Sequence, residues 1–257
     1  MPETTIATAR KFVWVELATP DAAAARDFYA KLFGWQIEVN PDPQYGGYAL
    51  AQIGDAQVAG IGPKMSPEGP TTWGLYVGTD DVDGLAEKVS SAGGTVLAPA
   101  FDVGDQGRMA VFADPTGAAI SAWQAGAMRN FLSGAANSLG WAELNSRGLE
   151  RAIPFYESIF EWTHETSPFG EGQEYTQFYV DGEAIAGALE MQPNIPAEVP
   201  SYWSVYFKVD DVDATFQKAI ELGAKEMVAP QDYPGGRFAI VSDPQGAMFA
   251  LYKSGGI

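Results

Sequence analysis

The segment Trp14-Val15-Glu16-Leu17 occurs a second time in the chain, as Trp141-Ala142-Glu143-Leu144. The same separation relates a series of aromatic pairs that follow each segment: Phe28 and Phe155, Tyr29 and Tyr156, Phe33 and Phe160, and Trp35 and Trp162. A repeat of this length decides the architecture more strongly than any single motif. The chain therefore consists of two copies of one structural plan.

Composition restricts the class of protein. The 257 residues are 46% hydrophobic and 12% aromatic, which is typical of packed globular domains. A formal net charge of −18 disfavours nucleic acid and anionic membranes as partners, because phosphate binding needs a cationic face. The absence of cysteine excludes disulfides and thiol chemistry. No stretch is long and apolar enough to span a membrane or act as a signal peptide, so we expect a cytoplasmic protein.

The first copy is expected to contain two successive units of strand, helix and three strands. Thr19-Pro20-Asp21 is expected to begin the first helix, with Thr19 as its N-cap, and Gly34 to end it. Asp80-Asp81-Val82-Asp83 begins the second helix. The expected strands of the first unit are 12–17, 35–39, 48–53 and 57–61, and those of the second are 72–77, 95–97, 108–113 and 118–123.

The second copy repeats this order after a turn-rich linker at 126–140. Its later landmarks are Asp210-Asp211-Val212-Asp213 and Asp243-Pro244-Gln245-Gly246-Ala247, and the latter repeats Asp114-Pro115-Thr116-Gly117-Ala118. Residues 1–10 are polar and are expected to be frayed. We therefore predict two domains, at 10–125 and 137–253.

These motifs together resemble the glyoxalase/bleomycin resistance/extradiol dioxygenase superfamily, also called the vicinal oxygen chelate superfamily. Within it the chain is most similar to two-domain actinobacterial glyoxalase-like proteins, often labelled 27 kDa antigen or hydroxylase. The resemblance implies an α+β fold with two tandem glyoxalase-like domains. Each domain would contain two βαβββ units that form a cup-shaped mixed sheet. It implies no single reaction, because one scaffold hosts many activities.

Members of the superfamily commonly hold a divalent metal in the cup through His, Glu or Gln. The resemblance places the corresponding positions on residues that are not usual metal ligands: Trp14, Gly74 and Ser121 in the first copy, and Trp141, Ser204 and Ala250 in the second. The chain has one histidine, His164, which lies outside these positions and which we interpret as structural. We therefore predict neither a metal nor another cofactor.

Glu16 and Glu143 are the candidate catalytic residues. Strand alternation places each glutamate on the same face as its tryptophan, Trp14 or Trp141, which should be the face that lines the cup. A carboxylate beside an indole can act as a general base or accept a hydrogen bond from a ligand. The alternative is a glutamate at the solvated mouth of a cup that the tryptophan fills.

Trp14 and Trp141 are candidates for ligand binding, and four further residues join them. Trp73 and Trp203 correspond across the repeat and would add aromatic surface to a cup that suits a flat, apolar molecule. The alternative is that some of these rings form ordinary core. Arg108 and Arg237 could hold an acidic group of a ligand, although pairing with local carboxylates is favoured in so acidic a chain.

Three functions remain open from the sequence. The first is metal-independent binding of an aromatic or antibiotic-like small molecule. The second is an enzyme, either with an unrecognised metal site or as a metal-free lyase, isomerase or hydroxylase that uses Glu16 or Glu143 as base. The third is a structural role with vestigial cups. Two copies in one chain can reproduce a dimeric arrangement, so a monomer or a homodimer is expected.

Overall fold

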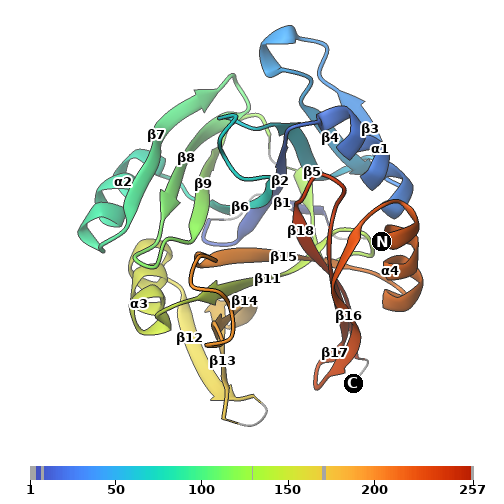
Figure 1. Ribbon diagram of the computed structural model, residues 1–257. Coiled ribbons are helices and arrows are strands. Elements are labelled where there is room, and N and C mark those ends of the chain that lie inside the picture. Colours follow the sequence, from blue (N-terminus) through green and yellow to red (C-terminus); the bar gives the residue numbers. More distant parts are fainter. Residues whose placement is uncertain (1–3, 7–8, 129, 170–171, 256–257) are drawn as a thin grey trace.

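A computed structural model describes residues 4–6, 9–128, 130–169 and 172–255 of the chain. In the described residues it contains two eight-stranded mixed sheets, four α-helices and one short 3₁₀ helix, η1 (Pro43–Tyr45), together with a small two-stranded sheet (Figure 1). Each large sheet is formed by one copy of the repeat. The α+β fold with two tandem domains of paired βαβββ units is therefore confirmed.

The sheet of domain 1 has the strand order β3-β4-β5-β2-β6-β9-β8-β7. Its strands are β2 (Phe12–Thr19), β3 (Gln36–Val39), β4 (Ala49–Ile53), β5 (Ala56–Pro63), β6 (Thr72–Gly78), β7 (Thr95–Val103), β8 (Gly107–Ala113) and β9 (Ala119–Ala125). The central pair, β2 and β6, is antiparallel and joins the two units into one curved sheet.

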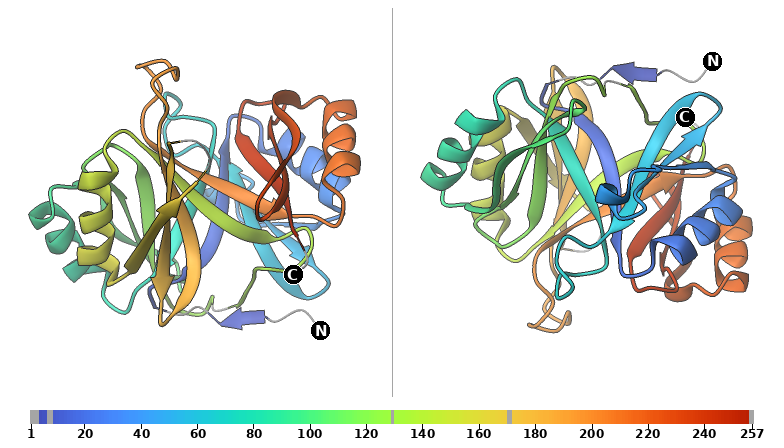
Figure 2. Two further views of the ribbon diagram at one scale, coloured as in Figure 1. Left: turned by 90° about the horizontal axis from the view of Figure 1, so that it is seen from below. Right: turned by 90° about the horizontal axis from the view of Figure 1, so that it is seen from above.

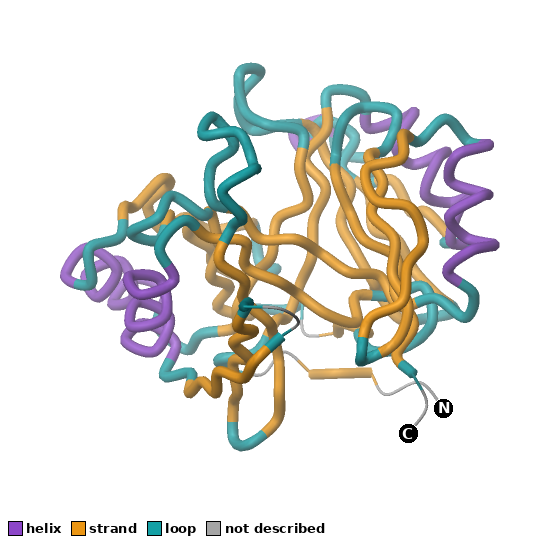
Figure 3. The backbone as a smooth tube through the Cα atoms, turned by 60° about the horizontal axis from the view of Figure 1, so that its bottom comes forward, coloured by secondary structure: helices purple, strands orange, loops and turns teal. Residues whose placement is uncertain are grey.

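The sheet of domain 2 has the equivalent order β12-β13-β14-β11-β15-β18-β17-β16. Its strands are β11 (Leu139–Ser146), β12 (Thr163–Pro168), β13 (Glu174–Val180), β14 (Glu183–Glu190), β15 (Tyr202–Lys208), β16 (Lys225–Tyr233), β17 (Gly236–Ser242) and β18 (Met248–Ser254). β11 and β15 form the antiparallel central pair. Both sheets curl into half-open cups, as the tube in Figure 3 shows.

The four helices lie outside the cups in two pairs, and each pair contains one helix from each domain (Figures 1 and 2). α1 packs against α4, and α2 packs against α3. The helices are α1 (Ala22–Phe33), α2 (Val82–Ser91), α3 (Leu149–Phe160) and α4 (Val212–Glu221). The two domains therefore share their helical layers.

Asp21, and not Thr19, is the N-cap of α1. The Asp21 carboxylate accepts a hydrogen bond from the Ala24 amide at 3.0 Å. Thr19 remains the last residue of β2, and its hydroxyl accepts from the Asp21 amide. Asp81 and Asp211 cap α2 and α4 in the same way, as their positions predicted. Gly34 ends α1 in the left-handed conformation, also as predicted.

The linker contains a strand that the sequence analysis did not predict. β10 (Asn130–Leu132) pairs with β1 (Thr4–Ile6), which lies in the segment expected to be frayed. Phe131 and Leu132 are buried and belong to the main core. The polar composition of the surrounding linker predicted a loop, but these two apolar side chains pack into the core and hold this part of the linker there. β7 is also longer than the predicted 95–97, because it continues to Val103 as an edge strand.

Two equivalent buried hydrogen bonds join the domains, and each domain supplies the donor of one of them. The Tyr29 hydroxyl on α1 donates to the Asp243 carboxylate of domain 2 at 3.0 Å. The Tyr156 hydroxyl on α3 donates to Asp114 of domain 1, also at 3.0 Å. Asp114 and Asp243 open the two Asp-Pro-x-Gly-Ala turns, whose amides they also bind. These turns therefore hold the domains together as well as reversing the chain.

Candidate functional site

Glu16 lies at the centre of the domain 1 sheet, on the face opposite the helices. Across β2 it is level with Gly60 of β5 and Gly74 of β6. Its neighbours Val15 and Leu17 point the other way and are fully buried in the helix-side core. The two glycines leave space above the sheet at this level, and larger side chains from further along the strands fill part of it.

Trp14, Glu16, Tyr48 and Tyr76 form a hydrogen-bonded group that we call the domain 1 quartet. The Tyr48 hydroxyl donates to one carboxylate oxygen of Glu16 at 2.8 Å, and the Tyr76 hydroxyl donates to the other at 3.3 Å. The Trp14 indole nitrogen donates to the Tyr48 hydroxyl at 3.3 Å. Trp14 and Glu16 therefore share the cup face, as strand alternation predicted.

The domain 2 quartet has the same connections, with Trp141, Glu143, Tyr175 and Tyr206 in the equivalent places. Tyr206 and Tyr175 donate to the two oxygens of Glu143 at 2.8 and 3.1 Å. The Trp141 indole donates to Tyr175 at 3.0 Å. The chain thus builds one polar arrangement twice, from equivalent strands.

A glycine beside each glutamate makes the quartet possible. A Cβ atom at Gly60 would lie 2.1 Å from the Tyr48 hydroxyl oxygen. A Cβ atom at Gly187 would lie 1.8 Å from the Tyr175 hydroxyl oxygen. Both distances are far inside van der Waals contact. Each tyrosine can therefore lie across the neighbouring strand only because that strand carries glycine there.

Burial raises the pKa of the Glu16 and Glu143 carboxyls above the ordinary value, and the hydrogen bonds from their tyrosines oppose this rise. Burial also raises the pKa of Tyr48 and Tyr76, and the charge of Glu16 adds to it. The phenols therefore stay protonated and act as donors at neutral pH. Each cup presents a carboxylate that retains lone pairs and a raised affinity for a proton.

The residues at the family's metal positions do not fit a metal ion. Trp14 and Ser121 lie on the cup face, where an indole N–H is a donor and the serine hydroxyl is a neutral ligand. Gly74 has no side chain. Within the described ranges, no group of three or more His, Cys, Asp or Glu side chains could hold a metal. We therefore derive no chemistry through a metal.

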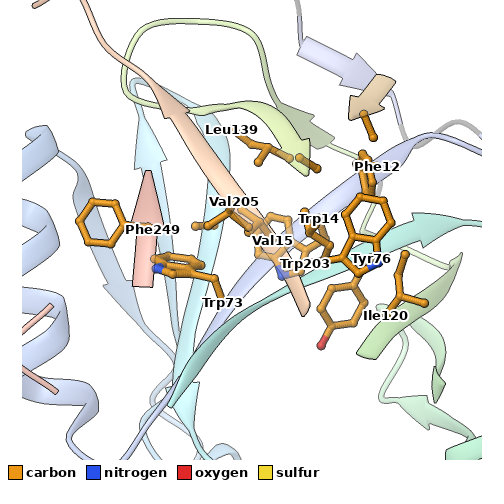
Figure 4. Packing of buried hydrophobic residues seen from close by; sticks show 14 of the residues in the cluster. Phe12, Trp14, Val15, Trp73, Tyr76, Ile120, Leu139, Trp203, Val205 and Phe249 are labelled. Carbon is orange, nitrogen blue, oxygen red and sulfur yellow. The ribbon is translucent and has the colours of Figure 1, made fainter. Parts of the chain in front are cut away.

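Trp73 and Trp203 lie on the helix side of the sheets and not in the cups. Trp73 is level with Leu17 across the β2–β6 pair, and its indole donates to the Tyr29 hydroxyl at 3.0 Å. Trp203 donates to Tyr156 at 2.8 Å in the same way. The Trp73 indole packs edge-on against Phe207 with a ring separation of 5.1 Å, and Figure 4 shows Trp73 away from Trp14 and Tyr76. Because both indoles are core residues that complete the interdomain contacts, we do not include them in the proposed ligand site.

Arg108 and Arg237 pair with nearby carboxylates, the interpretation that the acidic composition favoured. The Arg108 guanidinium donates to both oxygens of Asp83 and also to Asp102. Arg237 makes the equivalent contacts with Asp213 and Asp232. These pairs occupy the charged ends of both arginines, which therefore do not enter the proposed ligand site either.

Tyr48 and Tyr175 are the site residues that the sequence analysis missed. They occupy equivalent positions in the two copies, as do Gly60 and Gly187, so the repeat contained a signal. The repeat shows that these positions correspond, but it does not show that Tyr48 contacts Glu16, which lies 32 residues away in the chain. Tyr76 and Tyr206 also correspond across the repeat, three residues after Trp73 and Trp203, but nothing in the sequence pattern marks them as partners of the glutamates.

The chain belongs to the Glyoxalase/Bleomycin resistance protein/Dioxygenase superfamily, whose family model matches residues 11–121 and 138–251. It is 43% identical over 248 residues to "Putative glyoxylase CFP32" of Mycobacterium tuberculosis, with 93% of each chain covered. It is 36% identical over 255 residues to "Anthracycline biosynthesis protein DnrV" of Streptomyces peucetius, with 93% of this chain and 92% of that protein covered.

Solved structures share the fold at low sequence identity. The Mn(II)-bound glyoxalase from Novosphingobium aromaticivorans aligns with a TM-score of 0.64 and 16% identity, covering 98% of this chain and 83% of that one. BphC, a halotolerant catechol dioxygenase, aligns with a TM-score of 0.62 and 14% identity, covering 98% and 88%. At these identities the similarity extends to the fold alone. No helix in the described residues could cross a membrane.

Proposed function

We propose that the protein binds an aromatic small molecule in its cups without a metal, and that Glu16 and Glu143 accept hydrogen bonds from the ligand. The observation that carries this proposal is the duplicated quartet. Burying a carboxylate among aromatic rings costs stability. Such a buried carboxylate occurs in both domains, each time with two equivalent phenol donors. A role in recognition explains this duplication better than packing does.

The chemistry of the quartet suits a flat ligand with polar substituents. Aromatic side chains offer stacking surface, and the carboxylate takes a hydroxyl or amino hydrogen. Because the Streptomyces relative is named an anthracycline biosynthesis protein, polycyclic aromatic compounds of the anthracycline class are the first ligands to test. The ligand would meet the protein in the cytoplasm, where we place the chain.

Tryptophan fluorescence tests this proposal directly, because Trp14 and Trp141 belong to the quartets. We expect an anthracycline or a simpler polycyclic phenol to quench the fluorescence saturably and to raise Tm. The double variant Glu16→Gln/Glu143→Gln should weaken binding at least about tenfold, the loss expected for charge-assisted hydrogen bonds. The matched control is Glu87→Gln on the exposed face of α2, which should bind like the wild type. No saturable quenching and no thermal shift across the aromatic panel would contradict the proposal.

A second candidate is a metal-free enzyme of the same superfamily, a lyase, isomerase or hydroxylase. The raised pKa of Glu16 and Glu143 favours it, since a general base works best with a pKa near the working pH. Turnover that falls by a factor of about 10²–10⁴ in the glutamine variants while ligand still binds would support this candidate. Unchanged turnover in both variants would remove it.

A further inference from the structure

The carboxylate of Glu143 is buried without a cationic partner. The residue is 9% exposed, and the groups around its carboxylate are neutral: the phenols of Tyr175 and Tyr206, which donate hydrogen bonds to it, and the Asn145 amide. None of the ion pairs found among the described residues includes it. A buried charge is normally paired. Glu143 therefore carries a charge that a ligand could neutralise.

Domain 2 surrounds this charge with more aromatic and polar groups than domain 1 does. Tyr202 lies on the cup face of β15 and is level with Asn145 of β11. The Asn145 amide donates to the Ser204 hydroxyl at 3.3 Å, which extends the polar strip beyond Glu143. The equivalent positions of Tyr202, Asn145 and Ser204 in domain 1 hold Thr72, Ala18 and Gly74, so there the strip ends at Glu16.

A further tyrosine, Tyr233, lies at the end of β16 and packs edge-on against Phe238 with a ring separation of 5.8 Å. Its register partner is Gly236 of β17, which lies on the same strand face as Phe238. The register of β17 with β18 and of β18 with β15 continues this face to Tyr206, so Tyr233 lies on the cup face that carries Glu143. The equivalent residue in domain 1 is Val103, because Asp102 and Asp232 hold the equivalent arginines just before these positions. Tyr202 and Tyr233 therefore add two rings to the cup face of domain 2 at positions where domain 1 has Thr72 and Val103.

We propose that the cup of domain 2 binds an organic cation, namely an aromatic ligand with a protonated amino or quaternary ammonium group. Glu143 is the counter-ion, and Tyr175, Tyr202, Tyr206 and Tyr233 provide the aromatic rings. Tyrosine faces attract cations through their quadrupoles, and a carboxylate among them adds the opposite charge. The net charge of −18 also attracts cations towards the protein. This inference rests on the proposed function and specifies the ligand class of one cup.

Three probes with one aromatic body and different end groups test the inference by calorimetry: naphthylmethylammonium, naphthylmethanol and naphthoate. We expect the ammonium to bind about tenfold more tightly than the alcohol, with the carboxylate weakest, since cation–π and charge contacts favour the cation. Glu143→Gln should abolish the preference for the ammonium. Glu226→Gln, which removes an exposed carboxylate of the same domain, should leave it unchanged.

Two substitutions replace tyrosines of the domain 2 cup with the residues that domain 1 has at the equivalent positions, and they leave Glu143 unchanged. Tyr202→Thr and Tyr233→Val should each reduce the preference for the ammonium over the alcohol about threefold, because each removes one ring that attracts the cation. Thermal melting verifies that these variants fold. If the alcohol binds as tightly as the ammonium, or if the preference survives Glu143→Gln, the cation inference fails and the proposed function stands. If none of the probes binds, nor any compound of the aromatic panel, the proposed function fails as well.

Discussion

The two cups hold the same quartet in different surroundings. In domain 1, Phe131 of the linker packs edge-on against Trp14 with a ring separation of 5.7 Å, and Trp14 is 3% exposed. In domain 2, Trp141 is partly exposed, and no described ring packs against it. The phenylalanine near this quartet is Phe169, which contacts Tyr175 at 5.4 Å. The quartet is thus the common element, and the residues around it distinguish the cups.

This difference indicates how a duplicated domain can diverge. Hydrogen bonds inside the quartet restrict its members, because an apolar replacement of one leaves a buried polar group without a partner. Residues around it, such as Thr72 and Tyr202, take no part in the hydrogen bonds of the quartet. A duplicated site can therefore keep its polar centre and acquire a second specificity at its margin. The following predictions test the shared and the distinct parts of the cups separately.

Phe131→Ala should produce the largest effect, because it opens the covered side of Trp14. Phenylalanine-to-alanine changes in a core cost about 3–5 kcal/mol, and Phe131 is 1% exposed. Urea unfolding measures the cost, and acrylamide quenching should detect greater exposure of Trp14. Phe169→Ala, the matched change near the other quartet, should cost clearly less, since Phe169 is partly exposed. Equal losses of stability in the two variants would show that Phe131 covers the domain 1 quartet no better than Phe169 covers the domain 2 quartet.

Tyr29→Phe and Tyr156→Phe should destabilise the protein by similar amounts, about 1–3 kcal/mol each, because each leaves a buried aspartate oxygen and an indole N–H without their partner. The prediction follows from the equivalent geometry of the two interdomain contacts. Chemical denaturation compares the two variants. Tyr179→Phe, whose hydroxyl makes only a long contact with Gln177, is the control. Strongly unequal losses would contradict the symmetry of the interface.

Gly60→Ala and Gly187→Ala should each displace the tyrosine of their own quartet. Overpacking of this kind costs about 1–3 kcal/mol. We expect altered near-ultraviolet circular dichroism and loss of ligand quenching from the affected cup. Gly74→Ala is the control, because a Cβ atom there would lie 3.8 Å from its nearest neighbour. Retention of wild-type binding by both variants would mean that Tyr48 and Tyr175 are not needed in the cups.

Glu143→Gln should stabilise the protein at neutral pH, and Glu16→Gln should do so less, because Glu16 is more exposed. Burial holds the pKa of Glu143 in the folded state above its ordinary value of 4.5. Wild-type stability is therefore lost as the pH rises from that value through the folded-state pKa, while glutamine has no charge to bury. A gain of roughly 0.5–2 kcal/mol is expected, as for other substitutions that relieve a functional site. Thermal melts should show the gain at pH 7 and its disappearance near pH 4, and the same gain at both pH values would contradict this account.

Much of the fold was predictable because it follows from local patterns. The repeat, the capping aspartates and the Asp-Pro-x-Gly-Ala turns are short-range signals. The errors lie where a local signal had a competitor or was too short. Thr19 and Asp21 both suit an N-cap, and the strand geometry up to Thr19 decided for Asp21. The strand at Asn130–Leu132 has only three residues, too few for a periodic pattern.

The sequence by itself determined the two-domain plan and placed Trp14 with Glu16 on one face, because alternation along a strand needs no tertiary information. Only the tertiary structure showed that Tyr48 and Tyr76 reach Glu16, across 32 and 60 residues of chain. It also placed Trp73 in the core, since alternation assigns two faces but not which of them receives the helices. Such contacts depend on strand register and on the space left by glycines, and neither is written in a local pattern.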